Sequence, residues 1–207
     1  MAVGSVVFGL LQVAAVATPE ACTVPLSCES SATSTGGVLL VCPAGDGPTL
    51  SDIGATISVT LLWCTQAEPL VDLPPQNVWI QSKTLRDPRL CGGAGSSNAD
   101  GLTDINGQTT ISGSIAAGGY FGDGVYVVAN GSFIQLGDTC DNPLPLILVS
   151  PDINEDLVVS LADLAIFATA FPSGGGAVDP RMDFNGDGKI DAADLAMFAG
   201  HFRHSCP

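Results

Sequence analysis

Residues 183–202 read DFNGDGKIDAADLAMFAGHF, and residues 152–171 read DINEDLVVSLADLAIFATAF. The two stretches align at an offset of 31 residues. Within the first 12 residues of each, oxygen-bearing side chains stand at positions 1, 3, 5, 9 and 12, and an apolar pattern of helical period follows. An acidic loop of chance spacing would have to produce this arrangement twice in phase. The sequence therefore predicts two copies of one loop-and-helix unit.

The spacing of these oxygens is typical of a calcium loop, because Ca²⁺ takes about six to eight oxygen ligands and a 12-residue loop wraps alternate side chains around it. The predicted ligands of the second loop are Asp183, Asn185, Asp187, the Lys189 carbonyl, Asp191 (directly or through water) and Asp194. Those of the first loop are Asp152, Asn154, Asp156, the Val158 carbonyl, Ser160 and Asp163.

The two loops differ at position 6, where the sharp turn requires a positive φ. Gly188 occupies it in the second loop and Leu157 in the first. Forcing a leucine into that conformation costs on the order of 1 kcal/mol. We therefore expect two Ca²⁺ sites, of which the second binds more tightly.

Each loop leads into an expected helix, at residues 163–171 and 194–202. The apolar residues recur in each copy at i, i+3, i+4 and i+7: Leu164, Phe167, Ala168 and Phe171 match Leu195, Phe198, Ala199 and Phe202. The two stripes are expected to pack on each other. Val159 and Ile190, at position 8 of the loops, are expected to pair the loops through their backbones.

A loop followed by one helix, without the entering helix of an EF-hand, resembles the dockerin type I module of cellulosomal proteins. The resemblance covers residues 151–202, and both loops match the family's ligand pattern DxNxDxxxxxxD. It implies that calcium orders the module and that the module docks onto a cohesin partner. Positions 10 and 11, which carry partner choice in that family, are Leu161-Ala162 and Ala192-Ala193 rather than hydroxylated pairs.

The middle of the chain alternates short β-branched runs with turn clusters, which predicts an immunoglobulin-like β-sandwich. Asn106-Gly107 and Asn130-Gly131 suit two-residue turns with positive φ at both central positions. The second pair predicts a hairpin. The expected strands are residues 38–42, 56–63, 77–82, 109–115, 124–129, 132–136 and 144–149.

Residues 50–136 resemble the invasin/intimin type of bacterial immunoglobulin-like domain. The motifs that carry the resemblance are ATISVTLLW, TDINGQTTISGSI and GVYVVANG. The resemblance implies a spacer or adhesive module of a surface protein, without catalytic residues. Cys64 and Cys91 depart from the family pattern and suggest a local disulfide, with Cys42 and Cys140 as alternative partners.

The charge balance disfavours nucleic acids and anionic membranes as partners. Six Lys and Arg stand against 21 Asp and Glu, and the formal net charge is −15. No GxSxG, HExxH or nucleotide-binding glycine motif occurs, so we expect no enzyme. Asp100 and Asp104 could serve acid/base chemistry, but we expect turn residues there.

The seven cysteines include no CxxC pair, and the chain has two His. This pattern argues against a zinc site and favours disulfides in an oxidising, extracellular compartment. An odd number of cysteines leaves one sulfur unpaired within the chain or bridged to another chain. Cys206, beside the C-terminus, is the expected candidate.

The predicted organisation is an apolar N-terminal segment (residues 1–21), a sandwich (22–150) and a dockerin-like calcium domain (151–207). Residues 2–17 carry no charge and end in Ala15-Val16-Ala17, which is typical of a signal-peptidase site. Two alternatives stay open, a cleaved signal peptide or a retained strand for assembly with another copy; neither leaves a membrane span in the mature form. The sequence therefore predicts a mainly β, secreted structural or surface protein that self-associates into a filament or matrix. The alternative is a module that docks the sandwich onto a cohesin-like scaffold.

Overall fold

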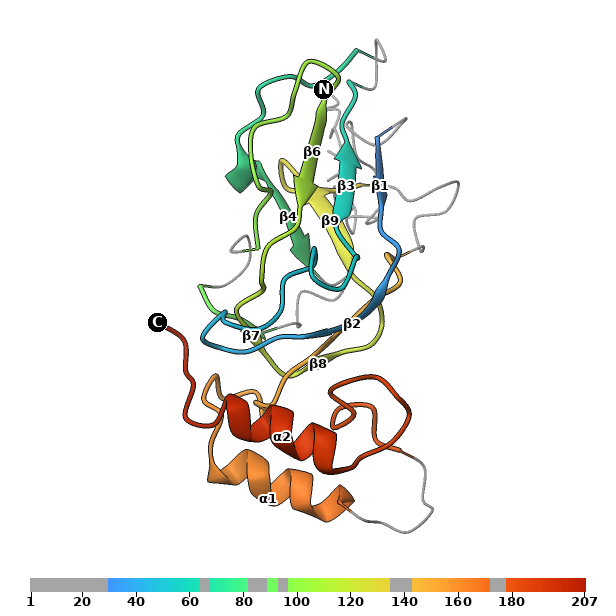
Figure 1. The fold of residues 1–207 in the computed structure, drawn as a ribbon. Coiled ribbons are helices and arrows are strands. Elements are labelled where there is room, and N and C mark those ends of the chain that lie inside the picture. The colour runs from blue at the N-terminus through green and yellow to red at the C-terminus, as the bar shows by residue number, and fades with distance from the viewer. Residues whose placement is uncertain (1–29, 64–67, 82–88, 93–96, 135–142, 172–177) are drawn as a thin grey trace, which may run out of the picture.

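A computed structural model describes residues 30–63, 68–81, 89–92, 97–134, 143–171 and 178–207. Strands make up most of the regular structure, and two helices lie side by side beneath them (Figure 1). Within these residues no helix has the length and apolar character needed to cross a membrane. The elements are β1 (Ser31–Thr33), β2 (Gly37–Leu40), β3 (Ile57–Thr60), η1 (Pro75–Asn77), β4 (Val78–Gln81), β5 (Arg89–Leu90), β6 (Gln108–Ile111), β7 (Ala117–Gly118), β8 (Tyr120–Phe121), β9 (Tyr126–Ala129), β10 (Ser132–Phe133), β11 (Leu146–Val149), α1 (Leu161–Ala170) and α2 (Ala192–Gly200).

The strands form four small sheets, with orders β1-β3-β6, β10-β9-β4, β2-β11-β8 and β5-β7. Every strand pair is antiparallel except β11 with β2, which is parallel. Each of the seven expected strands overlaps an observed one, although the observed strands are shorter. Four further strands, β1, β5, β7 and β8, have two or three residues each. Such short strands carry too few side chains for an alternating pattern to be read from sequence.

The two Asn-Gly pairs form different turns. Asn130 (φ 52°) and Gly131 (φ 80°) join β9 to β10 in the expected two-residue hairpin. At the other pair only Gly107 has a positive φ. There Asp104 and Gln108 close a three-residue loop: the Asp104 N–H donates to the Gln108 carbonyl at 2.9 Å, and the Gly107 N–H donates to the Asp104 carbonyl at 2.9 Å. The two-residue turn expected at Asn106-Gly107 was therefore wrong, since glycine at the third loop position favours the longer turn.

The sheet of β2, β11 and β8 separates two apolar cores. Leu39 and Leu148 contribute to the core among the strands, whereas the neighbouring Leu40 and Val149 contribute to the core against the helices. Successive residues of a strand face opposite sides, so a strand covered on both sides is apolar throughout. The helix-side core is completed by Cys42, Ile153, Val159, Phe167, Met182, Phe184 and Phe198. The other strands and the helices therefore pack on opposite faces of this one sheet.

The helices pack through a stripe that differs from the predicted one. Phe167 stacks on Phe198 with ring centroids 6.0 Å apart, as expected for two facing stripes. Ala168 and Ala199, however, are exposed, while Ile166 and Met197 are partly buried against the core. Phe184, from the second loop, also stacks on Phe167, at 5.7 Å. The stripe is rotated because the helices must bury a side toward the sheet as well as toward each other.

The C-terminal tail pairs with the first loop. The Val159 N–H donates to the His204 carbonyl at 2.9 Å, and the Arg203 N–H donates to the Val159 carbonyl at 2.8 Å. The expected pairing of Val159 with Ile190 was therefore wrong: the tail takes up the backbone groups of Val159.

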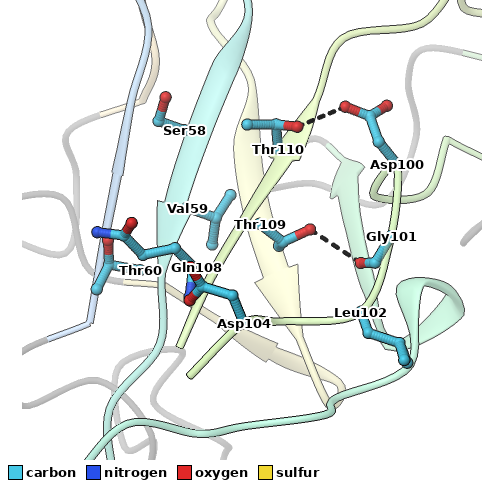
Figure 2. Close-up of a pocket in the computed structure, with 10 residues that line it drawn as sticks. All are labelled: Ser58, Val59, Thr60, Asp100, Gly101, Leu102, Asp104, Gln108, Thr109 and Thr110. Atoms are coloured by element: carbon cyan, nitrogen blue, oxygen red, sulfur yellow. Dashed lines mark hydrogen bonds between the residues drawn. The ribbon is translucent and has the colours of Figure 1, made fainter. Parts of the chain in front are cut away.

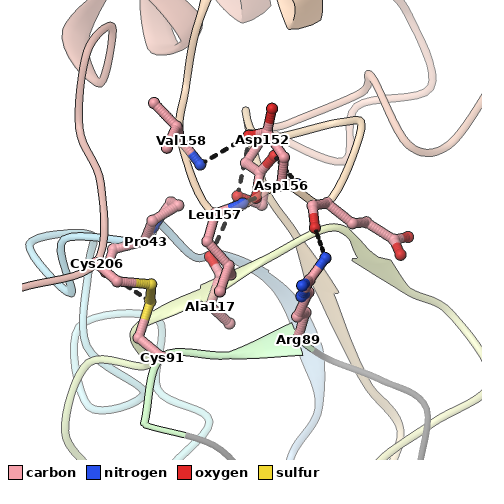
Figure 3. Close-up of a disulfide and its surroundings, with 11 residues drawn as sticks. Pro43, Arg89, Cys91, Ala117, Asp152, Asp156, Leu157, Val158 and Cys206 are labelled. Carbon is pink, nitrogen blue, oxygen red and sulfur yellow. Dashed lines mark hydrogen bonds between the residues drawn. A yellow bond between two sulfur atoms is a disulfide. The ribbon is translucent and has the colours of Figure 1, made fainter.

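The tail ends in a disulfide between Cys206 and Cys91, 115 residues apart (Figure 3). Cys206 is therefore not the unpaired cysteine, and Cys91 is not in the local disulfide expected with Cys64. Among the described cysteines the free one is Cys42, which is buried. Cys64 and Cys140, like residues 1–21, lie outside the described residues. Sequence spacing could not find the pair because only the pairing of the tail brings Cys206 to β5.

Candidate calcium-binding loops

The two loops share one hydrogen-bond scaffold around their first acidic residue. In the first loop Asp152 accepts the N–H groups of Asp156 (3.1 Å) and Leu157 (2.8 Å). In the second, Asp183 accepts those of Asp187 (3.1 Å) and Gly188 (2.8 Å). The residue at position 3, Asn154 or Asn185, accepts the N–H of position 5 in both loops. The repeat seen in sequence is thus a repeat of backbone structure.

Both loops turn sharply at positions 4 and 6. Gly186 (φ 71°) and Gly188 (φ 83°) take the left-handed conformation in the second loop. Glu155 (φ 63°) and Leu157 (φ 68°) take it in the first. The expected strain at Leu157 is present, and the sequence did not reveal the equivalent strain at Glu155. A side chain in this conformation costs roughly 1–2 kcal/mol, so the first loop is the more strained.

Position 12 closes each loop and also begins the following helix. Asp163 accepts the N–H of Ser160 at 2.8 Å, and Asp194 accepts the N–H of Asp191 at 2.8 Å. Ser160 and Asp191 in turn accept the N–H two residues on, which makes them the N-caps of α1 and α2 in a capping box. Position 9 is therefore a cap as well as a candidate ligand. This explains why the helices begin at Leu161 and Ala192, two residues before the expected starts.

Four of the predicted carboxylates are buried, which is unusual for aspartate. Asp152, Asp163 and Asp194 are 0% exposed and Asp183 is 9% exposed. No Lys or Arg pairs with any of them in the described part of the chain. Backbone N–H groups satisfy some of their lone pairs, but the negative charge is not balanced by protein groups. Buried charges of this kind are normally paired or coordinate a metal.

The carboxylates of the first loop lie close to one another. Among the described residues, Asp152, Asp156 and Asp163 bring their oxygens within 4.8 Å of each other. Burial raises the pKa of Asp152 to about 6, and the nearby charges of Asp163 and Asp156 raise it further against the lowering effect of its backbone hydrogen bonds. The equivalent acids of the second loop, Asp183, Asp187 and Asp194, are not gathered within this distance.

A hard cation fits the oxygen-only donor set of either loop. The greater affinity expected of the second site remains a prediction.

The first loop is packed against the strands, which the sequence did not predict. The Gly119 N–H donates to the Asp152 carbonyl at 2.8 Å, and a Cβ atom at Gly118 would clash with the Asp152 carboxylate. Arg89 donates to the backbone carbonyl of Glu155 (Figure 3). Strands β5 and β7 therefore support the loop. The sequence carries one trace of this contact, the pair Gly118-Gly119, because glycine lets another segment approach the backbone closely. The pair does not indicate that the approaching segment is the acidic loop.

A second group of acidic residues lines an open pocket beside β3 and β6 (Figure 2). Asp100 accepts the Thr110 hydroxyl at 2.6 Å and the Ser112 N–H at 3.1 Å. Asp104 accepts the N–H groups of Asn106 and Gln108, both at 2.8 Å, and the hydrogen bond from Gln108 holds the pKa of its carboxyl below the usual range. Asp104 is engaged in a turn, as the sequence predicted, whereas Asp100 bonds instead to β6 and to the residue that follows it.

No protein-family model matches this chain. No curated protein matches it in sequence.

Proposed function

We propose that this protein is an extracellular calcium-binding structural or surface protein, in which an immunoglobulin-like sandwich is joined to a dockerin-like pair of calcium loops. The observation that carries the proposal is the pair of loops with one hydrogen-bond scaffold, each closed by a buried carboxylate that pairs with no Lys or Arg among the described residues. Bound Ca²⁺ neutralises these carboxylates and so stabilises the loops and the helices that they begin.

Calorimetric titration of the full chain with Ca²⁺ tests the metal assignment. We expect two binding events, and Asp183→Ala removes the tighter one while Asp152→Ala removes the weaker one. Asp100→Ala is the matched control, because Asp100 is an acidic residue that lies outside the loops and accepts hydrogen bonds from Thr110 and Ser112. A wild-type chain that takes up no Ca²⁺ would refute the assignment, and equal losses in the two loop variants would refute only the ranking.

The proposed structural role includes self-association into a filament or matrix. The disulfide supports an extracellular setting, and the absence of catalytic motifs supports a role other than catalysis. Electron microscopy and gel filtration with and without a chelator test the assembly. A chain without residues 1–17 should stay folded and monomeric if that segment is the assembling strand. If the truncated chain forms fibres equally well, residues 1–17 are not the assembling strand.

An exposed leucine supports docking onto a cohesin-like scaffold as the alternative. Leu161 is 69% exposed at loop position 10, which carries partner choice in the family that this module resembles. Beside it, Val158 is 40% exposed. A scaffold that recognises this surface should lose its binding to a Leu161→Ser variant that still takes up Ca²⁺. A chain that is monodisperse with Ca²⁺ and forms no fibres favours this alternative over self-association.

A further inference from the structure

Four metal-ligating side chains that are not members of either calcium loop meet in the structure. Cys42 and Asp46 follow β2, while His201 and His204 follow α2. The Cys42 Sγ lies 3.5 Å from the His204 Nδ1. The Asp46 carboxylate faces both imidazoles, with its Oδ2 3.2 Å from the His204 Nδ1 and its Oδ1 3.6 Å from the His201 Nδ1. One ligand atom from each of the four residues falls within 4.8 Å of the other three.

Two of these separations match those of ligands on a tetrahedral metal. Zinc–nitrogen, zinc–oxygen and zinc–sulfur distances of about 2.0–2.3 Å give a tetrahedron with edges of about 3.3–3.6 Å. The His204 Nδ1 lies 3.5 Å from the Cys42 Sγ and 3.2 Å from the Asp46 Oδ2. In addition, the Nδ1 of His201 is buried and has no hydrogen-bond partner among the described residues. A metal would supply that partner.

The same residue types could form a Cys-His-Asp catalytic relay, but their geometry is against it. In a relay the nucleophile and the acid contact different nitrogens of the imidazole. Here Cys42 and Asp46 both approach the Nδ1 of His204. Cys42 is also 0% exposed, and burial raises the pKa of its thiol to about 12, which is opposite to the activation of a nucleophile. Ligand atoms of all four groups lie within 4.8 Å of one another, as a shared metal requires.

We propose that Cys42, Asp46, His201 and His204 form a tetrahedral site for a divalent transition metal such as Zn²⁺. A thiolate and two imidazoles select such a metal over Ca²⁺, which prefers the oxygen-only loops. Binding requires the Cys42 thiol to lose its proton to solvent, so uptake releases a proton. The metal would join the segment after β2 to the tail after α2, on the same tail as the Cys91–Cys206 disulfide. The spacing of the cysteines and histidines in the sequence argued against a zinc site, because the four proposed ligands come from two segments that are far apart in the chain.

Cobalt absorption tests the site on the full chain, with Ca²⁺ in excess so that the loops are filled. We expect one Co²⁺ per chain to give tetrahedral bands with a thiolate-to-cobalt charge-transfer band, and Zn²⁺ to displace it. Cys42→Ser should abolish the charge-transfer band. His201→Gln and Asp46→Asn should each weaken binding by at least about tenfold, as the loss of even a supporting group at a metal site does. Asp187→Asn, in the second calcium loop, should leave the cobalt spectrum unchanged.

The metal site can still be tested if one of these variants misfolds. Asp46 is half-exposed, so Asp46→Asn tests the site even if replacing the buried Cys42 unfolds the chain. Absence of a tetrahedral cobalt spectrum in the wild type, or a charge-transfer band that persists in a folded Cys42→Ser chain, overturns the proposal. So does cobalt affinity that is unchanged in both Asp46→Asn and His201→Gln.

Discussion

At the scale of single residues, the two loops differ most at their left-handed positions. Leu157 and Gly188 occupy equivalent positions, with φ of 68° and 83°. A Cβ at Gly188 would meet no atom within 4 Å, so any effect of Gly188→Ala is conformational. We expect this substitution to lower the free energy of unfolding by about 1 kcal/mol and Leu157→Gly to raise it by a similar amount.

Thermal unfolding with excess Ca²⁺ measures both changes, and calorimetry should show tighter binding at the first site of Leu157→Gly. Gly186→Ala is the contrasting control, because its Cβ would lie 2.7 Å from the Val38 side chain and should cost more than Gly188→Ala. If Leu157→Gly destabilises the chain, the packing of the leucine side chain outweighs its backbone strain.

The buried Asp152 carboxyl makes the stability of the metal-free protein depend on pH. Its pKa is about 6 in the folded chain against an ordinary value of 3.8, because burial and the charges of Asp163 and Asp156 disfavour ionisation. The folded state therefore holds this proton more tightly than the unfolded state does. The resulting stability is fully present below pH 3.8 and is lost as the pH rises through about 6.

We accordingly expect the chelated protein to unfold at a lower temperature near neutral pH than at about pH 5. Asp152→Asn should flatten this dependence. The lowered pKa of Asp179, which comes chiefly from its hydrogen bond with Arg181, acts in the opposite direction and only below its ordinary value of 3.8, so the two pH ranges do not overlap. A chelated wild type whose melting temperature rises steadily from pH 5 to neutrality would contradict the assignment.

At the scale of elements, each helix depends on its loop for its first turn. Ser160 caps α1 and Asp191 caps α2 through the same pair of hydrogen bonds. Ser160→Ala should therefore lower stability by about 1 kcal/mol and reduce helical circular dichroism in chelated protein. Ser160→Asp, which copies the second loop, should retain the cap. Equal losses in the two variants would show that the hydroxyl has a role other than capping.

At the scale of the whole molecule, the Cys91–Cys206 disulfide closes a large part of the chain. In the chain-entropy account a cross-link over about 100 residues stabilises the fold by as much as about 5 kcal/mol, and observed values are commonly about 2–4 kcal/mol. The tail is also held to the first loop, since the Cys206 N–H donates to the Leu157 carbonyl at 3.4 Å. We therefore expect removal of the disulfide to destabilise strands and helices together, because both pack on the sheet that contains β2 and β11.

The measurement is thermal unfolding of Cys206→Ser, Cys91→Ser and the double variant. All three should melt at the same lowered temperature, because either single change already breaks the bond. The wild type should fall to that temperature on reduction, while the double variant should not respond. Additive losses in the double variant would mean that the two cysteines stabilise the fold separately.

The sequence by itself determined the features that depend on neighbouring residues. Five features follow from local backbone geometry: the spacing of the oxygen-bearing side chains in each loop, the need for a left-handed turn at position 6, the two helices, the seven strand regions and the Asn130-Gly131 hairpin. Their side-chain periods and turn residues act over a few positions, so they can be read from one short stretch at a time.

Only the tertiary structure decided the features that join distant parts of the chain. It paired Cys91 with Cys206, paired Val159 with the tail instead of Ile190, rotated the helix stripes toward the sheet, and brought Cys42 and Asp46 to His201 and His204. None of these contacts has a local signal, because each depends on which side of the β2-β11-β8 sheet a segment covers. That choice is made by the burial of two cores at once, to which residues more than 100 positions apart contribute jointly.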